Sequence, residues 1–168
     1  GAGAAILEMT SGYAKDRISR WLPAMSSGEA VVTIGLYDEA NWIAAEAVTA
    51  KATVDGDNVT LHGKKPFVND ALAANYMLLA VQGPDGLALA AVGSDQVKVT
   101  AQPTIDSTKP MASVDIDGVQ ITTADLLAIS PEQLAFLTDC GGVATTAEMV
   151  GAGAAILEMT SGYAKDRI

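Results

Sequence analysis

Apolar and polar side chains alternate along the middle of the chain, between residues 47 and 81. Ala50, Ala52 and Val54 alternate with Lys51 and Thr53, and this two-residue period is typical of a half-buried strand. The Asp-Gly-Asp-Asn run that follows accepts positive φ and local hydrogen bonds, so it predicts a hairpin turn. The return strand and two further strands are predicted at residues 59–62, 67–68 and 76–81. A meander of this kind needs more strands or helices over its apolar face.

Short strands separated by turn residues continue on both sides of this meander. An apolar, β-branched run at residues 30–36 predicts a buried strand. The run Gln-Gly-Pro-Asp-Gly at residues 82–86 is a strong turn signal. Further strands are predicted at residues 87–92, 97–100, 112–116 and 119–121. This pattern predicts an α+β fold, mainly an antiparallel β-barrel or sandwich, flanked by N- and C-terminal helices.

Helical patterns occupy the two ends of the chain. Pro23 disfavours helical geometry at the residue before it, so we expect the first helix to end there. Thr123 can cap a short helix through residue 127, and the Ser-Pro-Glu-Gln run at residues 130–133 is a good helix start. A glycine pair at 141–142 can kink the last helix. The predicted units are an N-terminal helix at 1–22, a β-domain at 23–122 and a C-terminal helical segment at 123–168.

The two ends of the chain carry the same sequence. Residues 1–18 and 151–168 both read GAGAAILEMTSGYAKDRI, at an offset of 150. Natural repeats diverge and solenoid periods are much shorter. The identity therefore indicates artificial assembly, a tandem array or a circular unit read past its origin, and we favour an engineered chain. The second copy continues the helical pattern that precedes it.

Composition narrows the function classes. The chain has 168 residues, of which 49% are apolar, and its net charge of −10 argues against nucleic acid or an anionic membrane as partner. One cysteine, Cys140, and one histidine, His62, give no basis for a disulfide or a metal site. Glu148 and Glu158 interrupt the most apolar region, so no membrane span is expected. With no signal peptide, a cytoplasmic setting is the default.

One segment carries a resemblance to a known family. Residues 63–71 read GKKPFVNDA, which resembles the G-x-K-x-aromatic-aliphatic motif after a hairpin in the middle domain of the acyl-CoA dehydrogenases. The runs EMVG at 148–151 and YAKDR at 163–167 resemble the opening helix of that family's C-terminal domain. WLP at 21–23, followed by SGE at 27–29, resembles the link from its N-terminal helical domain. The resemblance covers roughly residues 19–168.

The resemblance implies a set of cofactor-binding residues. In that family the middle domain holds one side of the FAD ring and part of the acyl-CoA substrate. Leu36 and Tyr37 fall where a backbone amide and a threonine contact the flavin. Phe67 falls where an aromatic side chain packs by the isoalloxazine, and Asn69 where a hydroxyl bonds near the flavin N5. Arg167 matches an arginine that reaches the cofactor diphosphate in a neighbouring subunit, a task that suits its charge.

The sequence also departs from the family. A Thr-Glu-Pro motif followed by small residues is replaced at 37–44 by YDEANWIA, where only an acidic residue survives. Small residues let backbone amides approach a phosphate, and Trp42 and Ile43 would obstruct that approach. The family's usual catalytic carboxylate lies beyond the resemblance, so we assign no catalytic residue. Lys64 and Lys65 are expected on a solvated face.

Two hypotheses from different classes follow. The first is a fragment resembling the middle domain of an FAD-dependent acyl-CoA dehydrogenase, whose parent reaction is α,β-dehydrogenation of an acyl-CoA thioester, with the fragment inactive alone. In a variant of this hypothesis, the parent is a partner subunit with a degraded flavin site. The second is an engineered or non-catalytic β-barrel binding or scaffold module without cofactor. Its identical terminal helices can pair within one chain or exchange between chains as a domain-swapped homo-oligomer.

Overall fold

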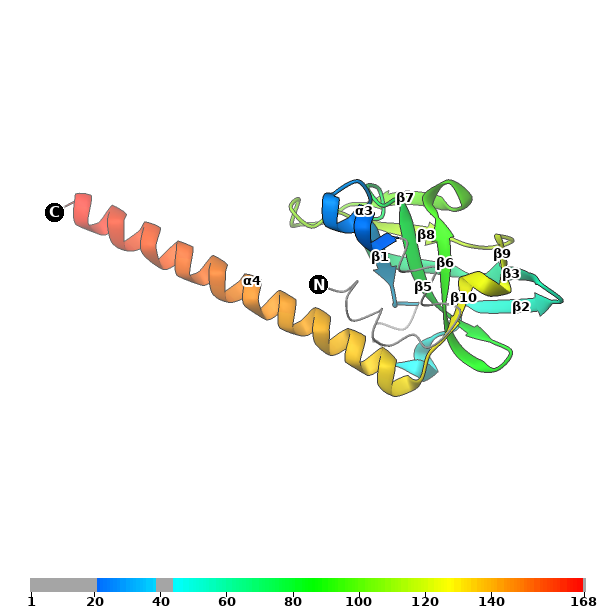
Figure 1. Ribbon diagram of the computed structural model, residues 1–168. Helices are drawn as coiled ribbons and strands as arrows, with labels where there is room; N and C mark the ends of the chain where they lie inside the picture. Colours follow the sequence, from blue (N-terminus) through cyan, green and yellow to red (C-terminus); the bar gives the residue numbers. More distant parts are fainter. Residues whose placement is uncertain (1–20, 39–43, 168) are drawn as a thin grey trace.

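A computed structural model describes residues 21–38 and 44–167 (Figure 1). The predicted N-terminal helix, up to residue 20, and the positions of Trp42 and Ile43 lie outside the described residues. The described elements are, in chain order, α3 (Trp21–Ser27), β1 (Val32–Gly35), η1 (Ala45–Ala47), β2 (Lys51–Asp55), β3 (Asn58–His62), β4 (Lys64–Asn69), β5 (Tyr76–Gly83), β6 (Gly86–Gly93), η2 (Ser94–Gln96), β7 (Lys98–Gln102), β8 (Met111–Asp115), β9 (Gln120–Thr122), η3 (Thr123–Asp125), β10 (Leu126–Ala128) and α4 (Pro131–Asp166).

The strands form two sheets. The larger sheet has the order β10-β6-β5-β2-β3-β9, with β1 also paired to β5, and the smaller has the order β4-β8-β7. Most pairs are antiparallel, but β1 and β2 run parallel to β5. The predicted α+β class, with a mainly antiparallel β-domain and a C-terminal helix, is confirmed.

The hairpin at the centre of the sequence forms where it was predicted. Strands β2 and β3 pair from Lys51–His62 to Asp55–Asn58, which leaves Gly56 and Asp57 in the turn. Gly56 has φ 61°, a left-handed conformation that glycine adopts without steric cost. Val59 and Leu61 on the return strand are fully buried.

Two apolar clusters form the core, and β5 contributes to both. Met77, Leu79 and Val81 belong to the first cluster, while Leu78 and Ala80 belong to the second, which includes α4 residues. All five side chains are fully buried. A strand that is buried on both faces is expected to be a continuous apolar run, which explains the sequence of β5.

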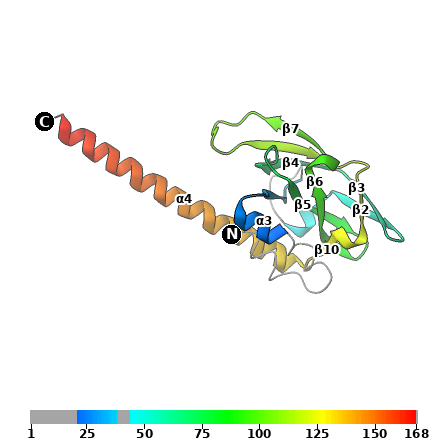
Figure 2. The same cartoon turned by 45° about the horizontal axis from the view of Figure 1, so that its top comes forward.

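Helix α4 begins with a capping box and then leaves the β-domain. Ser130 Oγ accepts a hydrogen bond from the backbone N–H of Gln133, and Gln133 Oε1 accepts one from the backbone N–H of Ser130. Of its 36 residues only Leu134 and Leu137 are buried. Its C-terminal half extends away from the sheets in both views (Figures 1 and 2).

Several local predictions were wrong. Helix α3 continues through Pro23 to Ser27, because a proline in a first helical turn leaves no required N–H unpaired. The predicted helix up to residue 127 is instead the short η3, followed by β10, which pairs with β6. Helix α4 runs as one element through the glycine pair at 141–142, since glycine lowers helix stability but keeps its backbone N–H.

The expectation that the chain has no segment able to span a membrane also changes. Glu148 and Glu158 do not prevent α4 from containing a window that is long and apolar enough to cross a membrane by length and composition.

Candidate functional site

Strand β1 lies close to β4 and β5 because Gly35 has no side chain. A Cβ atom at Gly35 would stand 2.7 Å from Leu79 Cδ2 and 2.9 Å from Val68 Cγ2. Both distances are shorter than carbon atoms tolerate. Two residues before Gly35, Thr33 Oγ1 donates a 2.6 Å hydrogen bond to the carbonyl of Asn69 at the end of β4. The ends of β1 and β4 are therefore held side by side.

Two aromatic side chains meet where these strands end. The ring centroids of Tyr37 and Phe67 are 6.4 Å apart and the ring planes cross at 88°, an edge-to-face contact. The register of β4 against β8 shifts between Lys65 and Val68. This shift buries both of those residues and leaves Phe67 44% exposed. Asn69 is exposed at the end of the same strand.

A buried ion pair connects Asp38, which follows Tyr37 in the sequence, with Lys65 of β4. Lys65 Nζ is 2.7 Å from Asp38 Oδ1, and the two side chains are 0% and 1% exposed. Asp38 Oδ2 accepts hydrogen bonds from the backbone N–H groups of Thr49 at 2.6 Å and Ala50 at 3.2 Å. Burial lowers the pKa of Lys65, against the hydrogen bond and the charge of Asp38, which both raise it.

The expectation that Lys65 lies on a solvated face was therefore wrong, although Lys64 is exposed. Two neighbours on a strand point to opposite faces, so at most one of the pair could be solvated if one face was buried. That alternation was the signal available in the sequence. It did not identify Asp38 as the partner, because the two residues are brought together only by the pairing of distant strands.

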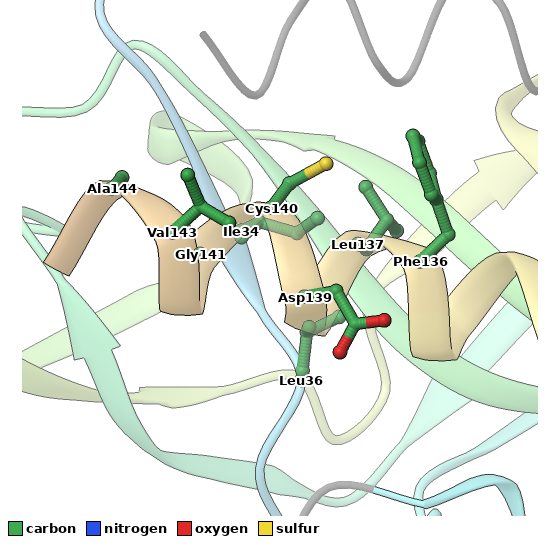
Figure 3. Close-up of a pocket in the computed structure, with 9 residues that line it drawn as sticks. All are labelled: Ile34, Leu36, Phe136, Leu137, Asp139, Cys140, Gly141, Val143 and Ala144. Carbon is green, nitrogen blue, oxygen red and sulfur yellow. The ribbon is translucent and has the colours of Figure 1, made fainter. Parts of the chain in front are cut away.

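Leu36 faces the opposite side of β1, toward α4. There it borders a cavity of about 590 Å³ between β1 and the first turns of the helix (Figure 3). The cavity is lined by Ile34, Leu36, Phe136, Leu137, Asp139, Cys140, Gly141, Val143 and Ala144. Asp139 supplies a carboxylate to a lining that is otherwise mainly apolar.

The structure brings together some of the expected site residues and not others. Tyr37, Phe67 and Asn69 gather at the β1–β4 edge, while Leu36 contributes its side chain to the α4 side. Arg167 lies at the far end of α4, with its guanidinium carbon 5.0 Å from the centre of the Tyr163 ring. Within the described residues, no group of three or more His, Cys, Asp or Glu side chains could hold a metal ion.

Comparisons with known proteins bear on the fold. No protein-family model and no curated protein matches the chain. Among solved structures, it is similar to a glutaryl-CoA dehydrogenase from Mycobacterium smegmatis in complex with FADH2, with TM-score 0.69 and 18% identity over 82% of this chain and 36% of that chain. A second structure of glutaryl-CoA dehydrogenase from that organism gives TM-score 0.65 and 24% identity over 80% and 36%.

A glutaryl-CoA dehydrogenase in complex with glutaryl-CoA gives TM-score 0.67 and 20% identity over 82% of this chain and 36% of that chain. The chain thus has the fold of a part of the acyl-CoA dehydrogenases, and the resemblance seen in the sequence is confirmed at that level. It spans about 36% of the length of these structures.

Proposed function

We propose that this chain is a flavin-facing β-module of the acyl-CoA dehydrogenase type. The observation that supports this proposal is the aromatic pair at the β1–β4 edge, where Phe67 is 44% exposed although a glycine and a buried ion pair fix the strands beneath it. A large exposed aromatic side chain on a rigid support suits stacking against a flat, partly apolar ring.

The described residues fit the ring portion of FAD. Phe67 and Tyr37 supply aromatic surface, Asn69 supplies an exposed amide for a polar ring atom, and the backbone N–H of Leu36 lies beside them in sequence. Arg167 would serve the cofactor diphosphate of a neighbouring subunit, since it stands far from this edge within its own copy.

Bound FAD would supply the oxidant for α,β-dehydrogenation of an acyl-CoA thioester in the whole protein. The residues of this chain would orient the flavin ring and exclude water from one of its faces. We assign no catalytic base, and we expect the chain alone to be inactive. We also propose that the whole protein binds acyl-CoA and is cytoplasmic. Homo-oligomer formation through the terminal helices is part of the same proposal.

The test is a titration of the purified chain with FAD, followed by visible absorption and by flavin fluorescence. Phe67→Ala should weaken binding at least about tenfold, because a buried aromatic contact is worth roughly 1.4 kcal/mol or more. Leu72→Ala is the matched control, since Leu72 is also an exposed apolar residue, at 58%, but lies in the turn after β4. Absence of binding at high micromolar FAD would overturn the proposal.

A second candidate function is a binding or scaffold module without cofactor. The observation that favours it is the Asp38–Lys65 pair. These two charged side chains are buried and bind each other rather than a ligand. The identical ends of the chain agree with an engineered origin. A chain that gives no flavin signal in the titration but remains folded would support this second function.

A further inference from the structure

Helix α4 loses its packing against the β-domain at one point along its length. Leu134 and Leu137 are buried, whereas every described residue of the helix from Gly141 onward is exposed. Gly141 and Gly142 therefore stand where the packing ends. A Cβ atom at either position would meet nothing within 4 Å, so the close fit of a neighbouring element does not account for these two glycines.

The glycine pair is a weak point of the helix. Glycine is less stable than alanine inside a helix because its backbone has more conformational freedom to lose. Glycine pairs are among the places where helices bend. Thr146 Oγ1 also donates a 2.8 Å hydrogen bond to the carbonyl of Gly142, and bonds of this kind bend helices. Residues 141 and 142 can thus serve as a hinge.

An ion pair holds the exposed part of α4 to the β-domain. Lys109 Nζ, in the segment between β7 and β8, donates a hydrogen bond to Glu148 Oε2. The base of that segment is fixed, because the backbone N–H of Asp70 donates a 2.9 Å hydrogen bond to the carbonyl of Pro110. An exposed ion pair contributes little to stability. The held and released positions of the helix are therefore close in free energy, and salt can shift their populations.

The same part of α4 borders the cavity between β1 and the helix. Gly141, Val143 and Ala144 line this cavity together with Cys140 (Figure 3). A swing of the helix at the glycine pair would move Val143 and Ala144 away from β1, while the buried leucines keep the first turns in place. The position of the exposed helix therefore determines how wide the cavity is on this side.

We propose that Gly141 and Gly142 form a hinge in α4 and that the Lys109–Glu148 ion pair is the latch that keeps the α4 wall of the cavity in place. Release of the latch lets the helix beyond the hinge swing away from β1 and widens the cavity. The proposal does not rest on the flavin-binding function, because every measurement that tests it is made without FAD.

The first test uses the chain's one cysteine, Cys140, as a reporter in the cavity wall. The folded chain is alkylated with iodoacetamide, an uncharged reagent, and the rate is followed by mass spectrometry. Lys109→Ala and Glu148→Gln should each raise the rate at least about twofold, since each breaks an exposed ion pair. Lys98→Ala and Glu158→Gln are the matched controls. They remove the same charges from exposed positions outside the latch and should leave the rate unchanged.

The two latch variants together separate hinge motion from a direct effect of charge on the thiol. Loss of a nearby positive charge disfavours the thiolate, and loss of a negative charge favours it. A direct effect would therefore change the two rates in opposite directions. Faster alkylation of both variants supports the latch, while opposite changes or unchanged rates would overturn it. High salt should accelerate the unsubstituted chain but not Lys109→Ala, because it screens the pair.

The position of the hinge is tested by replacing both glycines. Gly141→Ala with Gly142→Ala has space for both methyl groups and stiffens the helix. In this background Lys109→Ala should no longer raise the alkylation rate. Gly151→Ala with Gly153→Ala is the matched control further along α4, where added methyl groups also meet nothing, and it should preserve the effect. An equal effect of Lys109→Ala in both backgrounds would overturn the assignment of the hinge.

Spin labels measure the motion itself. In a Cys140→Ser background, labels at Thr53→Cys in β2 and Thr160→Cys in α4 report the distance between the β-domain and the distal helix by pulsed electron paramagnetic resonance. Lys109→Ala should broaden the distance distribution, and adding the two alanines at 141 and 142 should narrow it again. A distribution that neither change alters would overturn the proposal.

Discussion

At the residue scale, Gly35 determines how closely β1 approaches its neighbours. A Cβ atom would collide with Leu79 and Val68, both fully buried. We predict that Gly35→Ala destabilises the chain by about 1–3 kcal/mol, the usual cost of overpacking a core. Urea unfolding measures the change. Gly83→Ala is the control, because a Cβ there makes contacts of 3.4 Å or longer and should be nearly neutral.

The buried Asp38–Lys65 ion pair leads to a second prediction. Lys65→Met removes the partner of a buried carboxylate and should cost about 3–5 kcal/mol, while Asp38→Asn combined with Lys65→Met should recover part of the loss. Denaturant unfolding of both variants tests this. A double variant less stable than Lys65→Met would contradict it.

The same lysine gives a pH dependence with a defined sign. Its pKa in the folded chain lies below the ordinary value of 10.5, mainly through burial. Between the lowered pKa and 10.5 the unfolded chain binds more protons at this residue than the folded chain, so stability rises with pH there. The difference in the free energy of unfolding between the unsubstituted chain and Lys65→Met should therefore increase as the pH rises through that window. A flat or falling difference would contradict the prediction.

Sequence reasoning selected the residues of the aromatic edge as site candidates but did not predict what supports them. Phe67 and Asn69 were selected because they lie within a recognisable motif in one continuous segment, and their role stays a prediction. Asp38 and Lys65 were missed as a pair because 27 residues separate them. Nothing in a local pattern distinguishes a lysine that is paired in the core from one that is solvated.

At the element scale, the start of α4 depends on its capping box. Ser130→Ala removes the acceptor for the Gln133 N–H and should cost about 1 kcal/mol. Amide hydrogen exchange in residues 131–137 should become faster, while exchange in β5 stays unchanged. Ser107→Ala, in an exposed turn, is the control. Equal exchange rates in both variants would show that packing of Leu134 and Leu137 alone fixes this end.

Strands with strong alternation or flanking turn residues were predicted well, as the hairpin of β2 and β3 shows. The segment at residues 123–128 was not, because three residues cannot establish a period. Its identity as η3 and β10 is decided by pairing with β6, a contact from outside the segment. Helix α4 was predicted from its cap and its helical spacing.

At the scale of the whole molecule, the described core ends long before the chain does. No residue of α4 after Leu137 is buried. We predict that a chain ending at residue 144 keeps the same denaturant midpoint for its β-domain, measured at dilutions where self-association is absent. The Lys109–Glu148 pair that is lost is exposed to solvent, so its loss should change the midpoint little. A large drop in the midpoint would show that the distal helix supports the β-domain.

The parallel pairing of β1 with β5 has a consequence for how the chain reaches its fold. The two strands join segments 44 residues apart, as the hydrogen bond from Val31 N–H to Asn75 Oδ1 shows. Bringing together two strands so far apart in the sequence costs loop-closure entropy before any contact between them can form. The hairpins can form early, but β1 must wait for β5 to be in place. Folding should thus be slow for a domain of this size, in the millisecond-to-second range typical of non-local β-topologies.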